Sequence, residues 1–154
     1  MIATFLNRLR RLPFPWRRPP LQVGALPWRR SGEGGLEVLL VTSRGTGQWI
    51  LPKGWPEPGR GPAETAAREA YEEAGVSGRI DPREMGRFLH LKSRIARPSL
   101  RCMIAVHPLA VERELADWPE RAERRRRWFP AEEAAGAVRS AELAALIRRL
   151  DQIA

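Results

Sequence analysis

Residues 54–76 constrain the fold more than any other part of the chain, because a loop rich in glycine and proline runs directly into a helical pattern there. Pro62 suits the first turn of a helix, where the N–H group that proline lacks is not needed. Gly75 follows the last residue of the pattern and is typical of a left-handed C-cap. The pattern therefore predicts a helix that begins near Pro62 and ends just before Gly75.

The two faces of this helix differ in character. One face is apolar and built mostly of small residues, which lets a helix lie close against a sheet; it comprises Ala63, Ala66, Ala67, Ala70, Tyr71 and Ala74. The other carries Glu69, Glu72 and Glu73, at spacings that place three carboxylates on one patch. We expect this acidic arc to face away from the packing surface, toward solvent or a cleft.

The acidic arc is either a metal site or an ordinary solvated helix face. Three carboxylates this close repel one another unless cations neutralise them, and a hard divalent metal with oxygen ligands is the simplest occupant. The alternative is a solvated helix face, in which Glu64 and Arg68 form an exposed pair. The preceding residues favour the first interpretation, since an apolar strand, a rigid loop and a helix N-terminus together form a good phosphate site.

These residues together resemble the Nudix box, the signature of the Nudix hydrolases. That pattern is a glycine, five residues, Glu, seven residues, Arg-Glu, an apolar residue, any residue, Glu-Glu, any residue, Gly and an aliphatic residue. The chain meets eight of the nine fixed positions, with Gly54, Arg68, Glu69, Ala70, Glu72, Glu73, Gly75 and Val76. The ninth position departs, because Arg60 stands where the pattern has its first Glu.

The resemblance implies an α/β fold, a sandwich with a mixed β-sheet between helices, and hydrolysis of a phosphoanhydride with Mg²⁺ (or Mn²⁺) as cofactor. Glu69, Glu73 and the backbone carbonyl of Lys53 are the implied metal ligands, and Glu72 is the implied general base. The division of roles among the three carboxylates varies within the family. A third acidic ligand from outside the box would come from Glu112, Glu114, Glu120 or Glu123, each of which is more simply a surface charge.

The segments 41–45 and 48–55 look most like the branch that hydrolyses diphosphoinositol polyphosphates and diadenosine polyphosphates. By that resemblance Thr42, Ser43 and Arg44 would contact the polyphosphate, although ordinary polar residues at a strand end explain Thr42 and Ser43 equally well. Arginines and a lysine suit the remaining phosphates; the candidates are Arg44, Lys92, Arg94, Arg97 and Arg101.

Two other functions stay open. The net charge of +9 favours an RNA 5′-end pyrophosphohydrolase, although the chain has no recognisable RNA module. Arg60 reverses a charge in the box, which bears on the number of bound metals and on the loop geometry. A Nudix domain that binds nucleotide without cleaving it is therefore the second alternative.

Length and composition predict one catalytic domain over residues 21–154, preceded by a basic extension over residues 1–20 that carries five arginines and no acid. Cys102 is the only cysteine, lies in an apolar run and is expected in the core, so a reducing cytoplasm is the expected compartment. No apolar run approaches the length of a membrane span.

The rest of the chain alternates strands and helices. Pro27 suggests that the first strand lies at a sheet edge or ends irregularly. The expected strands are 21–28, 36–43, 49–51, 86–92, 100–109 and 124–129, and helices are expected to begin at Pro130 and to cover 140–153.

Overall fold

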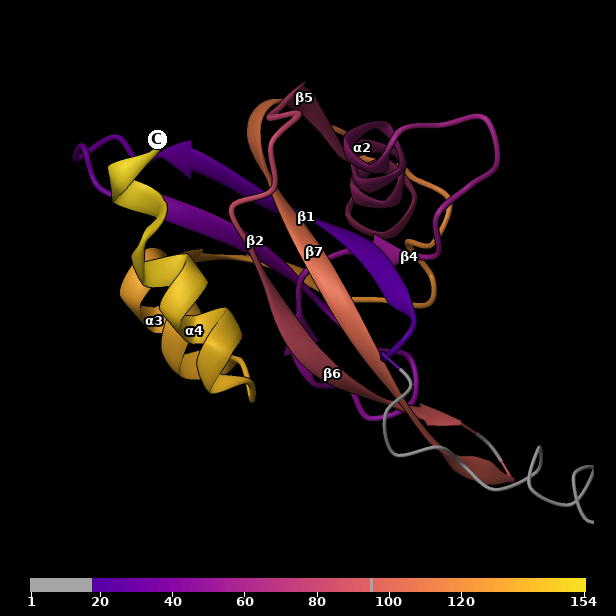
Figure 1. Ribbon diagram of the computed structural model, residues 1–154. Helices are drawn as coiled ribbons and strands as arrows, with labels where there is room; N and C mark the ends of the chain where they lie inside the picture. Colours follow the sequence, from indigo (N-terminus) through magenta and orange to yellow (C-terminus); the bar gives the residue numbers. More distant parts are fainter. Residues whose placement is uncertain (1–17, 95) are drawn as a thin grey trace, which may run out of the picture.

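The computed structural model describes residues 18–94 and 96–154, so most of the predicted extension 1–20 lies outside the described residues. One mixed sheet carries α2 on one face and α3 and α4 on the other (Figure 1). The predicted α/β/α sandwich is confirmed. The elements in chain order are β1 (Leu21–Arg30), β2 (Leu36–Thr42), β3 (Trp49–Ile50), β4 (Lys53–Gly54), α2 (Pro62–Ala74), β5 (Val76–Ile80), β6 (Gly86–Arg94), β7 (Arg97–Glu114), β8 (Arg126–Pro130), α3 (Ala131–Ala137), α4 (Ala141–Arg148) and the 3-10 helix η1 (Leu150–Gln152).

Strand β1 lies at the centre of the sheet. It runs parallel to β7 from the pair Leu21–Met103 to the pair Trp28–Ala110, and antiparallel to both β2 and β4. The main path of the sheet is β3-β2-β1-β7-β5, with β6 beside β7 and β8 beside β2. Because β4 pairs with the central strand, the start of the loop that leads from β4 into α2 is fixed by the sheet.

The prediction that Pro27 marks a sheet edge is wrong. Pro27 falls between the residues of β1 that pair with β4, Val23 and Gly24, and those that pair with β2, which begin at Trp28. The Ala25 N–H donates to the Pro52 carbonyl oxygen, so by alternation the Pro27 nitrogen also faces this gap rather than β7, and a proline there removes no ladder hydrogen bond. The residue is therefore tolerated in an interior strand at the point where β1 changes partner.

Each face of the sheet has its own apolar core. On the α2 face, Ala66, Ala70 and Ala74 pack against β1 and β2, so the predicted stripe of small residues does bring the helix close to the sheet. Tyr71 and Ala63, which the sequence placed in that stripe, are not buried. On the other face, Phe88 of β6 and Ile104 of β7 lie in one cluster with Leu143 and Leu146 of α4. Ala134 and Ala135 of α3 belong to the same cluster.

The C-terminal end of α2 is closed as predicted. Gly75 has a φ of 65°, in the left-handed region, and its N–H donates to the carbonyl oxygen of Tyr71 at 3.0 Å. The Arg126 guanidinium donates to the carbonyl oxygen of Ala74 at 2.9 Å and lies 3.8 Å from the centre of the Trp118 ring. A cation at this position complements the negative end of the helix dipole.

Some elements differ from the predicted ones. Strands β4 and β5 are not anticipated by the sequence patterns, and β7 extends well beyond residues 100–109. The single helix expected over 140–153 is divided into α4 and η1. Cys102 is buried as expected. In the part of the chain that the structure describes, no helix has the length and hydrophobicity needed to cross a bilayer.

Replacing Gly75 by alanine should destabilise the protein by about 1–3 kcal/mol, because the left-handed backbone disfavours a Cβ and the new atom would crowd Arg126 and Trp118. Gly136→Ala is the matched control. Gly136 lies within α3 at a position where a Cβ would meet nothing within 4 Å, so the same change should stabilise by up to about 1 kcal/mol. Urea unfolding of both variants measures the difference, and equal effects would contradict this account of the cap.

Candidate active site

The acidic arc of α2 was expected to face away from the packing surface, toward solvent or a cleft, and this is wrong for Glu73, which is buried against β4. Glu73 is only 6% exposed and lies between α2, β4 and the segment that leads into β8. Its Oε2 accepts from the Lys53 N–H at 3.3 Å, and its Oε1 accepts from the Arg124 guanidinium at 3.0 Å. The Glu73 carboxylate is therefore held by one backbone donor and one buried cation.

Glu69 lies one helical turn before Glu73 and lies against Gly54 of β4. A Cβ atom at position 54 would overlap with the Glu69 carboxylate, so only glycine leaves room for it. Within the described residues Glu69 has no ion-pair partner, in contrast to Glu73. The glycine at the start of the box thus brings the β4 backbone and an uncompensated carboxylate together.

The environment of these two carboxyl groups favours their protonated forms. Burial, together with the negative charges of Glu73 and Glu72, raises the pKa of Glu69 to about 7. Burial also raises the pKa of Glu73 to about 7, although Arg124 and Lys53 oppose that rise. A bound cation would relieve the same repulsion.

Glu72 is directed toward Arg68 rather than toward the other two carboxylates. The Arg68 Nε donates to Glu72 Oε1 at 2.7 Å and lies 3.5 Å from Glu57 Oε1. Within residues 18–94 and 96–154, no three His, Cys, Asp or Glu side chains lie close enough together to hold one metal ion. Glu69 and Glu73 therefore fit a hard divalent cation as a pair of oxygen donors beside β4, and further ligands must come from the backbone, water or substrate.

Arg124, which the sequence patterns did not single out as a partner of the carboxylates, and Glu120, one of four outside carboxylates considered from sequence, both lie beside the acidic arc. Arg124 has a side chain only 9% exposed, and it contacts Glu73, Glu120 and the carbonyl oxygen of Thr42. The Glu120 N–H donates to the carbonyl oxygen of Glu72 at 3.0 Å, which ties the 115–125 segment to α2. Of the four outside carboxylates considered from sequence, Glu120 is the one whose charge acts on both Glu69 and Glu73.

The comparison with known families decides the assignment. A model described as the NUDIX domain matches residues 18–150. The chain belongs to the Nudix family. The prediction from the box is confirmed, and the box provides the loop, Gly54 and the carboxylates of α2 described above.

Relatives and solved structures agree with this assignment. The chain is 41% identical over 101 residues to diphosphoinositol polyphosphate phosphohydrolase 3-alpha of Homo sapiens, covering 64% of this chain and 57% of the relative. It is 36% identical over 132 residues to mitochondrial Nudix hydrolase 16 of Arabidopsis thaliana, covering 77% and 72%. A NUDIX hydrolase structure from Nitrosomonas europaea has a TM-score of 0.64 at 21% identity, over 88% of this chain and 90% of that one, so the fold is shared.

The chain spans about half the length of several of the relatives that it matches. The activities that the relatives are named for are therefore activities of longer proteins.

The predicted polyphosphate contacts Thr42, Ser43 and Arg44 lie where β2 ends. The Thr42 hydroxyl is buried and accepts from the Arg125 N–H at 2.9 Å, and the Ser43 hydroxyl is bonded to Thr46 within a turn. Arg44 is 62% exposed and reaches Glu120 and Glu123 at 3.8 and 3.6 Å. Both hydroxyls are thus engaged locally, and Arg44 has the most exposed side chain of this trio.

Basic side chains gather on β4 and β6. Burial lowers the pKa of the Lys53 amine, and burial with the charges of Lys53 and Lys92 lowers the pKa of His90 to about 4. The Lys92 ammonium lies 5.6 Å from the centre of the Trp55 ring, which is 41% exposed. A positive, partly aromatic surface therefore adjoins the strand that contacts Glu69 and Glu73. The phosphate contacts expected of Lys92, Arg94, Arg97 and Arg101 stay predictions.

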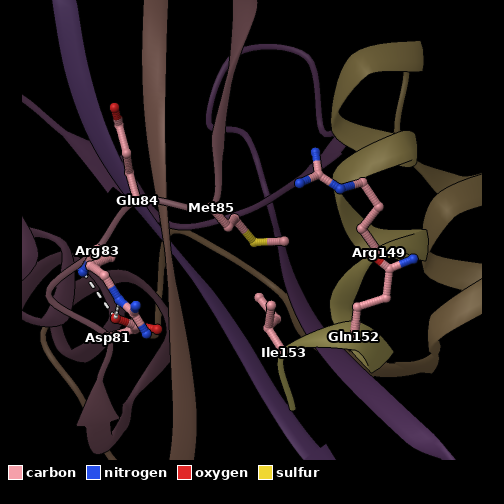
Figure 2. A pocket seen from close by; sticks show the side chains of 7 residues that line it. All are labelled: Asp81, Arg83, Glu84, Met85, Arg149, Gln152 and Ile153. Atoms are coloured by element: carbon pink, nitrogen blue, oxygen red, sulfur yellow. Dashed lines mark hydrogen bonds and ion pairs between the residues drawn. The ribbon is translucent and has the colours of Figure 1, made fainter.

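A hollow of about 310 Å³ lies elsewhere, between the β5–β6 connection and η1 (Figure 2). Its lining residues are Asp81, Arg83, Glu84, Met85, Arg149, Gln152 and Ile153. None of the predicted site residues lines it, so this hollow plays no part in the candidate active site.

Gly54→Ala should displace the Glu69 carboxylate from β4 and weaken binding of Mn²⁺ by about tenfold or more. Isothermal titration with Mn²⁺ measures the change. Gly45→Ala is the control, since a Cβ there would meet nothing within 4 Å. Unchanged affinity in the Gly54 variant would show that Glu69 does not depend on this close approach.

The raised pKa of Glu69 makes a prediction about pH. In the unfolded chain the Glu69 carboxyl ionises near 4.5, and in the fold it ionises near 7, so the metal-free protein loses stability as pH rises through that interval. Glu69→Gln removes this loss. In EDTA the variant should therefore gain in Tm relative to the wild type between about pH 5 and pH 8, measured by thermal unfolding. Parallel Tm curves for the two proteins would contradict the prediction.

Proposed function

We propose that this chain is a Mg²⁺-dependent (or Mn²⁺-dependent) pyrophosphohydrolase that cleaves a phosphoanhydride. The proposed substrates are nucleoside polyphosphates, dinucleoside polyphosphates or diphosphoinositol phosphates. The observation that carries the proposal is the pair of carboxyl groups, Glu69 and Glu73, both with pKa raised to about 7 and both in contact with β4. Perturbed carboxyl groups beside a phosphate-binding type of loop are typical of a metal-assisted hydrolase.

Each group has a proposed role. Glu69, Glu73 and the Lys53 carbonyl would hold the metal next to the anhydride. The metal, when bound, would lower the pKa of a water and stabilise charge on the leaving phosphate. Arg124 would keep Glu73 in place while Glu69, which has no cation of its own among the described residues, supplies the free negative charge.

Glu72 is proposed as the general base. Its carboxylate is partly exposed and accepts from Arg68, so it can receive a proton from a water while Arg68 fixes its orientation. Arg68 itself has its pKa raised by the hydrogen bond to Glu72, so it stays charged throughout. Its role is to orient the base rather than to contact the substrate.

The positive surface supports a polyanionic substrate. Lys53, Lys92 and the exposed Arg44 lie on elements around the carboxylate pair, and phosphate oxygens are the natural partners for such groups. The human relative is named for activity on diphosphoinositol polyphosphates, which is the same chemical class.

A substrate panel tests the function. Product formation would be measured with nucleoside triphosphates, dinucleoside polyphosphates, a diphosphoinositol phosphate and triphosphorylated RNA, each with Mg²⁺, Mn²⁺ or EDTA. The proposal expects metal-dependent cleavage of a small anhydride. Preferred cleavage of RNA would favour the RNA 5′-end alternative, and binding without turnover would favour a non-catalytic domain.

Glu72→Gln should lower kcat by about 10²–10⁴-fold, because the amide cannot accept a proton as the carboxylate of a general base does. The circular dichroism spectrum should change little. Glu133→Gln on α3 removes an exposed carboxylate of equal charge away from α2 and should leave kcat unchanged. A near-normal rate in the Glu72 variant would assign the base to another residue.

A further inference from the structure

The surroundings of Arg60 explain how the chain accommodates its departure from the Nudix box. The Arg60 Nε lies 2.9 Å from Glu57 Oε2, and the other oxygen of Glu57 lies 3.5 Å from the Arg68 Nε. Arg68 in turn donates to Glu72 at 2.7 Å. A single loop carboxylate therefore connects the altered position to the arginine and base of α2.

We infer that Glu57 is a positioning residue that supplies, from three positions earlier in the loop, the carboxylate that Arg60 removes from the box. Because both Glu57 oxygens are occupied, one on Arg60 and one on Arg68, the reversed charge is neutralised and Arg68 is shared between Glu57 and Glu72. The inference rests on the proposed function in that Glu72 is taken as the base.

The sharing has a chemical consequence. Without the Glu57 carboxylate, Arg68 would keep Glu72 as its one ion-pair partner among the described residues, so no loop residue would fix the guanidinium that orients Glu72. The Arg60 cation would keep only Glu64, at 3.9 Å, as an ion-pair partner among the described residues. These side chains are about one-third to two-fifths exposed, so each pair adds little to stability and the effect of Glu57 falls on orientation and charge.

The geometry also predicts a rescue. The carboxylate oxygens introduced by R60E would stand the same number of bonds from Cα as the Arg60 Nε, which lies 2.9 Å from the Glu57 carboxylate that also contacts Arg68. In E57Q/R60E the carboxylate is thus returned to the position that the family pattern gives it. E64Q is the matched control, because Glu64 also pairs with Arg60 but makes no contact with Arg68.

The experiment compares the wild type, E57Q, R60E, E57Q/R60E and E64Q in two assays. Mn²⁺ affinity is measured by titration calorimetry without substrate, and kcat and KM are measured on the best substrate of the panel. We expect E57Q to weaken Mn²⁺ binding about threefold and to lower kcat about tenfold, with KM within about twofold and an unchanged Tm. E57Q/R60E should recover to within about threefold of wild type, and E64Q should match wild type.

Several outcomes would overturn the inference. One is that E57Q behaves like E64Q in both assays, and another is that the double variant is no better than E57Q. A third is that the loss of activity in E57Q is accompanied by a lowered Tm, which would indicate a structural role only. If the wild type binds Mn²⁺ but does not hydrolyse any substrate, the proposed function fails while the Mn²⁺ titrations still decide the role of Glu57. If the wild type does not bind Mn²⁺, both fail.

Discussion

The buried pair of Glu73 and Arg124 is the constraint on which the rest of the site depends. Glu73 lies in the last turn of α2, at the negative end of the helix dipole, where a carboxylate is unfavourable. Arg124 compensates from a segment 51 residues later and also donates to the Thr42 carbonyl at the end of β2. Removing either partner would leave a buried charge without compensation, which typically costs about 3–5 kcal/mol.

The same arrangement leaves an electrostatic imbalance one turn away. Arg124 neutralises Glu73 but does not reach Glu69, which the Gly54 backbone admits at close range. Arg68 and Arg60 are occupied with Glu57, Glu72 and Glu64. Within residues 18–94 and 96–154, each carboxylate of the arc except Glu69 thus has a cationic partner, and we propose that the remaining charge attracts a divalent cation to this end of β4.

The sequence predicted local features well and long-range contacts poorly. The helix bounds at Pro62 and Gly75 and the burial of Ala66, Ala70 and Ala74 depend on neighbours within one or two turns, and these were confirmed. The burial of Glu73 was not predicted, because helical spacing shows which residues share a face but not that Arg124 would reach it from another element. Pro27 was misplaced for the same reason, since strand order is set by pairing across the sheet rather than by the residues of one strand.

An anomalous diffraction experiment on crystals soaked in Mn²⁺ at about pH 8 tests the central claim most directly. The account predicts an anomalous peak within coordination distance of carboxylate oxygens of both Glu69 and Glu73, with Arg124 still paired to Glu73. A Mn²⁺ peak elsewhere on the molecule, with none between these two side chains, would contradict it.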